Sequence, residues 1–455
     1  MLKSTEPTSN GASAWSINLP QEIGAPDDFA PLTIEDEGTV QLVHQRLIQE
    51  VDIKAIERLG PDRSLEAVEM ATRALVMQVA PGIYGERREQ IIRRVVDDAV
   101  GLGPLQPLIK DLDISEIMVN APDEIFYERD GIIYLSALRF RDRGHVMLVI
   151  DRIISPLGRR IDESSPFVDA RLPDGSRVNI IIPPLVPRSP TITIRKFRPD
   201  RFDMNDLIKI GTLTQQSADF LRLCVQLRLS MVISGGTGTG KTTILNALSA
   251  YIPERERIIT IEDPIELRLQ QRHVISSEAR PPNIEGRNEV TQRDLLRNAL
   301  RMRPDRIIVG EVRGGEAFDM MQAMNTGHEG SLTTVHANSP RDALSRIENM
   351  VLMAGFDLPI RAIREQMTSA FQVMIQLSRF ADGSRRVIGI SEVVGMEDET
   401  VTMQEIFRFE ISHIEQDGRI VGQLEPTGIM PTFAERFTKA GISIETIIPT
   451  VGRWS

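Results

Sequence analysis

A glycine-rich segment that ends in lysine and threonine is the part of this sequence best suited to chemistry. Residues 235–242 read Gly-Gly-Thr-Gly-Thr-Gly-Lys-Thr and match the pattern G-x-x-x-x-G-K-[ST]. The glycines let the backbone curl so that several amides point at a phosphate chain, next to the positive end of a helix. Lys241 then reaches the β- and γ-phosphates of a bound nucleotide, and the Thr242 hydroxyl is placed to ligate Mg²⁺. We predict that the nucleotide contacts Gly235, Gly236, Thr237, Gly238, Thr239, Gly240, Lys241, Thr242 and Thr243.

Two glutamates follow apolar runs that are typical of buried strands. Glu262 follows Ile258–Ile261, and Glu311 comes shortly after Ile307–Val309, at a position where such sites more usually carry aspartate. In a parallel sheet the carboxyl ends of the strands form the ligand-binding edge, so both carboxylates are expected beside the glycine-rich loop. They are suited to organising Mg²⁺ and to orienting an attacking water. The predicted metal ligands are Thr242 and Glu311.

Two of the six histidines lie close together in the segment 327–338. His336 follows the predicted strand 332–335, where its imidazole is placed to sense a γ-phosphate. We also assign His328 to the nucleotide site. A zinc site is disfavoured, because the eight-residue separation does not suit chelation from one helix face and Cys224 is the only cysteine.

The pattern around these segments predicts an α/β domain over residues 207–455. Short apolar strands alternate with amphipathic helices, which is typical of a parallel sheet covered by helices. The expected strands are 231–234, 258–261, 307–309 and 332–335. The expected helices are 242–251, 294–302, 317–324 and 340–350.

The amino-terminal half shows different patterns. Residues 1–36 are rich in Ser, Pro and Asn and are predicted to be a flexible tail. Three stripes of helical period predict a small helical bundle over 37–101. Alternating strands, a helix over 145–155 and a Pro-Asp-Gly turn at 173–175 predict an α+β domain over 102–197. Residues 198–206 are the predicted linker.

Composition limits the classes of partner. Lys and Arg total 53 against 64 Asp and Glu, so the formal net charge is −11 and a general nucleic-acid coating function is excluded. No run approaches the roughly 20 apolar residues that span a bilayer, and the amino terminus lacks a secretory signal pattern. We therefore expect a cytoplasmic protein.

Four segments, taken in order, resemble the type II/type IV secretion and pilus-assembly ATPases. They are the glycine-rich loop, Thr260–Glu266, Val309–Arg313 and Gly327–Asn338. Within that family, segments 103–108, 115–120 and 169–179 look like the tight-adherence (Flp) pilus branch, as do 280–283 and 300–306. The resemblance covers about residues 40–455.

The resemblance implies a fold, an activity and partners. It implies an α/β, RecA-like P-loop domain, preceded by a PAS-like α+β domain and a three-helix bundle. It implies a ring-shaped homohexamer that hydrolyses ATP with Mg²⁺ at the cytoplasmic face of the inner membrane, where it meets platform proteins of a pilus or secretion machine. Glu262 would be the water-activating base and Glu311 would support Mg²⁺ and water. Arg171, Arg177 and Arg195 would reach ATP from the PAS-like domain.

A second class of function uses the same kind of core. A nucleic-acid translocase or helicase also carries such a loop, but the acidic charge and the 5% aromatic content disfavour stacking on single strands. A transporter ATPase would need an LSGGQ-like signature, which the sequence lacks. Whether the motor extends a pilus, retracts it or does both is left open.

Overall fold

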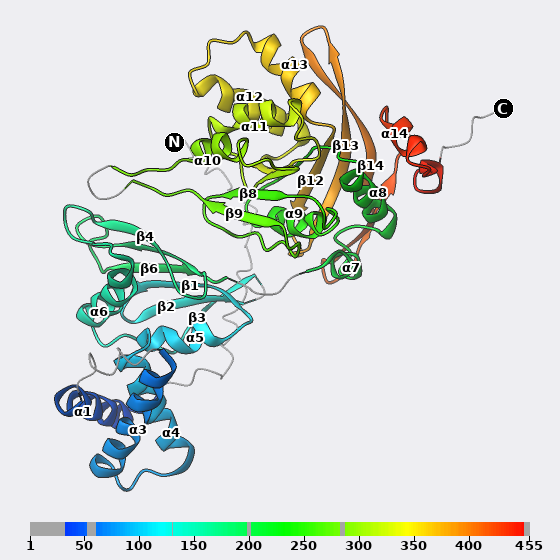
Figure 1. Cartoon of the computed structure of the whole chain (residues 1–455). Coiled ribbons are helices and arrows are strands. Elements are labelled where there is room, and N and C mark those ends of the chain that lie inside the picture. The colour runs from blue at the N-terminus through cyan, green and yellow to red at the C-terminus, as the bar shows by residue number, and fades with distance from the viewer. Residues whose placement is uncertain (1–31, 52–60, 130, 198–201, 283–286, 450–455) are drawn as a thin grey trace, which may run out of the picture. The chain divides into compact units, whose positions relative to one another are not determined.

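A computed structural model describes residues 32–449 of the chain, apart from 52–60, 130, 198–201 and 283–286 (Figure 1). The chain divides into two compact units, Met1–Pro199 and Asp200–Ser455. Most of the predicted tail, residues 1–31, and the proline-containing part of the predicted linker, residues 198–201, lie outside the described residues.

Among the described residues of the first unit, three helices come first. They are α1 (Ile34–Glu50), α3 (Pro61–Val79) and α4 (Gly85–Ala99), and residues from all three form one buried apolar cluster. Helix α1 begins inside the segment predicted to be tail. The reason is local: the Thr33 side chain accepts a hydrogen bond from the Asp36 amide, and three acidic residues occupy the first turn, where they favour the helix dipole.

A six-stranded antiparallel sheet follows in the same unit, with strand order β3-β2-β1-β6-β5-β4. Helix α6 (Arg143–Ile154) packs on it, because Val146 and Val149 share a buried cluster with Ile117 and Val178 of the sheet. The other elements here are α5 (Gln106–Lys110), β1 (Ile114–Ala121), β2 (Glu124–Arg129), β3 (Ile132–Leu135), β4 (Phe167–Arg171), β5 (Arg177–Ile181) and β6 (Thr191–Arg195).

The second unit is built on a nine-stranded sheet of order β15-β14-β13-β12-β7-β11-β10-β8-β9. The strands from β12 to β9 run parallel, and β13, β14 and β15 extend the sheet in antiparallel fashion. The α/β class predicted for this region is confirmed. The strands are β7 (Met231–Gly235), β8 (Ile258–Glu262), β9 (Val274–Glu278), β10 (Arg306–Val309), β11 (Leu332–His336), β12 (Val373–Arg379), β13 (Arg385–Glu397), β14 (Thr400–Ile414) and β15 (Ile420–Pro426).

Helices cover both faces of this sheet. Successive residues of a strand point to opposite faces, and the central strands carry apolar residues on both. Met231 and Ile233 of β7 belong to one buried cluster, whereas Val232 belongs to the other. Figure 1 shows α11, α12 and α13 gathered on one side of the sheet. One group of helices is α10 (Gln292–Ala299), α11 (Glu316–Asn325), α12 (Pro340–Met353) and α13 (Ile360–Ala370); the other is α7 (Met204–Lys209), α8 (Gln215–Gln226), α9 (Lys241–Ser249) and α14 (Ala434–Lys439). Helix α7 begins within the segment 198–206 that was predicted to be linker.

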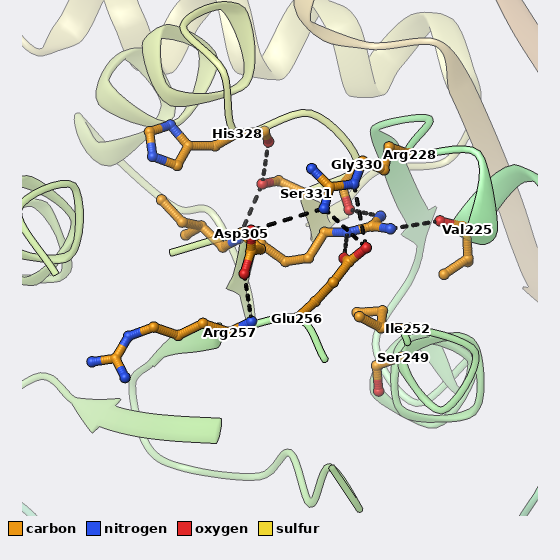
Figure 2. A network of polar contacts seen from close by, with 12 residues as sticks. Val225, Arg228, Ser249, Ile252, Glu256, Arg257, Asp305, His328, Gly330 and Ser331 are labelled. Carbon is orange, nitrogen blue, oxygen red and sulfur yellow. Dashed lines mark hydrogen bonds and ion pairs between the residues drawn. The ribbon is translucent and has the colours of Figure 1, made fainter. Parts of the chain in front are cut away.

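A buried guanidinium ties together the amino-terminal starts of the central strands. Arg306 is the first residue of β10 and is 0% exposed. Its Nε donates to Glu256 Oε2 at 2.6 Å, and its Nη atoms donate to the carbonyls of Gly330 at 2.9 Å and Val225 at 2.8 Å. Figure 2 shows these three partners around one centre. They lie just before β8, just before β11 and on α8, which leads into β7, so Arg306 fixes the strands at the edge opposite their carboxyl ends.

Candidate active site

The glycine-rich loop connects β7 to α9, in the strand–loop–helix arrangement that the sequence predicts. Gly238 and Gly240 adopt φ values of 71° and 95°, in the left-handed region that glycine tolerates without a steric cost. A Cβ atom on Gly235 would lie 2.6 Å from Thr239 Oγ1 and 2.9 Å from the Leu377 carbonyl oxygen. The tight curl of the loop therefore depends on glycine at these positions.

Lys241 lies within this loop rather than in solvent. Its side chain is 7% exposed, and Nζ donates to the carbonyls of Gly235 at 3.1 Å and Gly236 at 2.8 Å. Both ring nitrogens of His336 are 3.4 Å from Nζ. The structure thus brings the predicted lysine and the predicted histidine together at the carboxyl edge of the sheet.

Glu311 lies in the same cluster. Its Oε1 is 3.0 Å from His336 Nε2, and its Oε2 accepts a hydrogen bond from Arg313 Nη2 at 2.7 Å. Partial burial raises the pKa of Glu311, but Arg313, His336 and Lys241 outweigh that effect and lower it overall. Burial, assisted by the charge of Lys241, lowers the pKa of His336 despite the opposing influence of Glu311. Glu311 is therefore a carboxylate at neutral pH and His336 is mostly neutral.

Glu262 is the more buried of the two predicted acids. It ends β8 next to β10 in the sheet and is 2% exposed. Its Oε2 accepts the amides of Glu266 at 2.7 Å and Leu267 at 2.8 Å, while Oε1 accepts the Thr260 hydroxyl at 3.1 Å. Burial raises the pKa of Glu262, and these hydrogen bonds oppose the increase. A carboxylate held in this way is rigidly oriented and protonates more readily than an exposed one.

Thr242 at the start of α9 and Glu266 after β8 fit a magnesium ion. Thr242 Oγ1 lies 3.4 Å from Glu266 Oε2, so a hydroxyl and a carboxylate oxygen meet beside the phosphate-binding loop. Mg²⁺ prefers such oxygen ligands and usually takes only one or two from the protein. Sequence reasoning missed Glu266 and Arg313, although both lie within the motif segments and follow strand ends. Glu311 remains a predicted ligand, and in this structure Arg313 and His336 are its partners.

The structure does not bring His328 to the loop. The register pairs Leu332 with Met231 and His336 with Gly235, so the amino end of β11 lies at the sheet edge opposite the loop. His328 precedes that end. Its amide donates to the Ala323 carbonyl at 3.2 Å. Its carbonyl accepts from the Ser331 hydroxyl at 2.8 Å (Figure 2). His328 is therefore removed from the nucleotide site of this unit, because a strand of five residues separates the two edges.

The three predicted arginines belong to the first unit and form a row across its sheet. Arg177 on β5 is directly opposite Arg171 on β4 and also opposite Arg195 on β6. Arg195 Nε lies 3.9 Å from Glu116 Oε1 on the next strand. Like charges in adjacent cross-strand positions repel, so this row is suited to an anion.

A glycine-rich loop between a strand and a helix, a buried lysine and two carboxylates at or just beyond strand ends are typical of P-loop nucleotide-binding proteins. The family model for type II/IV secretion system proteins matches residues 98–420, and the chain belongs to this family. The family predicted from the four motif segments is thereby confirmed. The tight-adherence branch stays a prediction.

Individual relatives agree with this family membership. A putative conjugal transfer protein of Mycobacterium tuberculosis is 36% identical over 306 residues, which cover 66% of this chain and 86% of that protein. The type IV secretion system protein PtlH of Bordetella pertussis is 36% identical over 313 residues, which cover 63% of this chain and 91% of PtlH.

Solved structures with similar chains include an ATPase and a motor. The VirB11 ATPase of the Brucella suis type IV secretion system, in complex with sulphate, is 32% identical with a TM-score of 0.35, and the match covers 63% of this chain and 94% of that one. The pilus retraction motor PilT with bound ADP is 22% identical with a TM-score of 0.46, covering 72% and 83%. Family membership rests on the sequence similarities. Within the described ranges, no helix is both long and apolar enough to cross a membrane.

Proposed function

We propose that this protein is a Mg²⁺-dependent ATP hydrolase that powers assembly of a pilus or a related secretion machine. The observation that carries the proposal is the position of Lys241, held by two loop carbonyls and placed 3.4 Å from His336. An ammonium in a cradle of amides neutralises the charge on β- and γ-phosphates, which is the main requirement of phosphoryl transfer. Family membership supports the same role.

The carboxylates divide the remaining work. Glu262 acts as the general base that orients the attacking water and accepts its proton as the bond from the β,γ-bridging oxygen to the γ-phosphorus breaks. Glu311 supports Mg²⁺ and water, and His336 senses the γ-phosphate. Thr242 and Glu266 would hold Mg²⁺, and the ion would supply charge neutralisation on the phosphate oxygens.

The first unit supplies the arginines. We propose that it comprises a three-helix bundle and a PAS-like domain, and that the second unit is a RecA-like motor domain. The row Arg171, Arg177 and Arg195 reaches ATP when the domains close, and mobile guanidiniums then stabilise the charge that develops on the transferred phosphoryl group. Hydrolysis thereby depends on domain movement, which is how chemical energy becomes mechanical work.

The proposed assembly is a homohexamer at the cytoplasmic face of the inner membrane, where it binds platform proteins of a tight-adherence pilus. In a ring, an inactive subunit should impair its neighbours. Wild-type protein mixed with the Lys241→Ala variant at fixed total concentration should lose activity more steeply than dilution predicts. A strictly linear loss would argue for independent subunits.

The arginine row gives a matched test. Arg171→Ala and Arg177→Ala should reduce turnover more than nucleotide affinity. Arg188→Ala, which breaks an exposed ion pair with Glu124 in the same unit, is the control. A nucleic-acid translocase is distinguished by its stimulant: its turnover would rise with single-stranded DNA, whereas we expect a rise with anionic lipid vesicles.

A further inference from the structure

The hairpin between β12 and β13 lies beside the glycine-rich loop. β12 runs parallel to β7, with Leu377 paired to Gly235 at the end of that strand. β12 continues for two more residues, so Arg379 passes the point where β7 ends and the loop begins. The turn is firmly built, because Asp382 accepts the amides of Ser384 and Ile420, both at 2.9 Å.

The Arg379 guanidinium comes close to the loop itself. A Cβ atom on Gly238 would lie 4.0 Å from Arg379 Nη1, and one on Gly240 would lie 4.0 Å from Arg385 Cδ. Gly238 and Gly240 are the two positive-φ residues of the phosphate cradle. β12 and β11 flank β7 on opposite sides, so Arg379 approaches the cradle from the side away from His336.

The positive charges of Arg379 and its cross-strand neighbour favour binding of an anion. It is directly opposite Arg385 in the register of the hairpin, and like charges in that arrangement repel. In the part of the chain that the structure describes, the exposed Arg379 side chain makes no hydrogen bond or ion pair. Arg386, which follows Arg385 in the sequence, differs from Arg379 in having partners. Its guanidinium donates to the carbonyls of Gly422 at 3.2 Å and Ile420 at 2.8 Å.

We propose that Arg379 is a nucleotide-binding residue that contacts the α- and β-phosphates from the β12 side of the loop. This rests on the proposed function, namely nucleotide binding at the loop. Lys241, His336 and Glu311 surround the γ-phosphate from the β11 side, which leaves the other side of the phosphate chain to Arg379. The contact is the same in ATP and ADP, so it contributes to binding and little to the chemical step.

Calorimetric titration of the full-length chain with ADP and with a non-hydrolysable ATP analogue tests the proposal. Arg379→Ala should weaken binding of both by roughly tenfold, as expected for a lost charge-assisted hydrogen bond. Arg379→Lys keeps the charge but not the planar fork and should recover part of the affinity. The control is Arg419→Ala, which removes an exposed arginine paired with Asp417 at the β14–β15 turn. It should bind both nucleotides as the wild type does.

The outcomes separate the two claims. If the wild type and Arg419→Ala bind nucleotide and Arg379→Ala binds it equally well, the inference is wrong while the proposed function stands. A loss confined to the ATP analogue would also overturn it, because Arg379 would then face the γ-phosphate. If the wild type binds neither nucleotide, the proposed function itself fails.

Discussion

Glu311 Oε1 and His336 Nε2 lie 3.0 Å apart, which links the ends of β10 and β11 through one polar contact. Lys241 Nζ also contacts the imidazole, 3.4 Å from each ring nitrogen. A neutral imidazole that contacts both a carboxylate and an ammonium can donate to the first through one nitrogen and accept from the second through the other. In the proposed function, this contact would connect a γ-phosphate sensed by His336 to the carboxylate of Glu311.

Replacing each acid by its amide should separate their roles. Glu262→Gln and Glu311→Gln keep the side-chain shape, so both variants should still bind ATP. Loss of a positioned base typically costs about 10²–10⁴-fold in rate, and we expect this cost for Glu262→Gln. The measurement is phosphate release at saturating ATP, with binding verified by titration. Normal turnover of Glu262→Gln together with an inactive Glu311→Gln would move the base to Glu311.

The buried guanidinium at the opposite edge should matter for stability. Arg306→Ala leaves the Glu256 carboxylate buried with fewer partners, and breaking a buried pair in this way costs about 3–5 kcal/mol. Denaturant unfolding, monitored by hydrogen exchange of the β8 and β10 amides, measures the lost free energy of unfolding. Arg301→Ala, at an exposed position, is the matched control and should stay within about 0.5 kcal/mol. Equal stability of the two variants would contradict the anchoring role of Arg306.

The sequence predicts the loop, Glu262, Glu311 and His336 because each follows a short apolar run, and parallel strands bring such ends to one edge. The role of Arg306 was not predictable from local pattern. Its partners Val225, Glu256 and Gly330 are separated by 24 to 81 residues along the chain from it, so only the sheet order brings them together.

The same reason explains what was missed in the carboxyl-terminal third. β13, β14 and β15 extend the sheet through antiparallel pairing. The sequence pattern of the preceding α/β region does not predict this change of strand direction. Only the pairing of β12 with β7 places Arg379 beside the glycine-rich loop. His328 lies at the sheet edge away from the loop, because closeness to His336 in sequence does not determine which edge of the sheet a residue reaches.

The contact between α4 and α6 predicts a pH dependence of stability in the first unit. His145 is 3% exposed, and its Nε2 lies 3.6 Å from Asp98 Oδ1. Burial lowers the pKa of His145 to about 4, although Asp98 opposes the shift. The unfolded chain therefore binds more protons between its ordinary pKa of 6.5 and about pH 4. This contribution is fully present above the ordinary pKa and is lost as the pH falls.

His145→Gln isolates this contribution, because glutamine does not titrate. The stability advantage of the wild type over the variant should shrink by up to about 3 kcal/mol as the pH falls from 6.5 to 4. Hydrogen exchange of α4 and α6 amides in the full chain is the measurement. The comparison is needed because burial also raises the pKa of Asp97 to about 6, which changes stability in the opposite sense. A constant difference across this range would contradict the assignment to His145.

Binding of ATP for hydrolysis by the loop at 235–242 is tested most directly at Lys241. Lys241→Ala removes the ammonium that is held against two loop carbonyls, while the glycines and the fold around them stay in place. Steady-state phosphate release by purified wild-type and variant protein, with Mg²⁺ and ATP, is the measurement. We expect turnover by the wild type and no turnover above background by a folded variant. Equal turnover by the two proteins would contradict it.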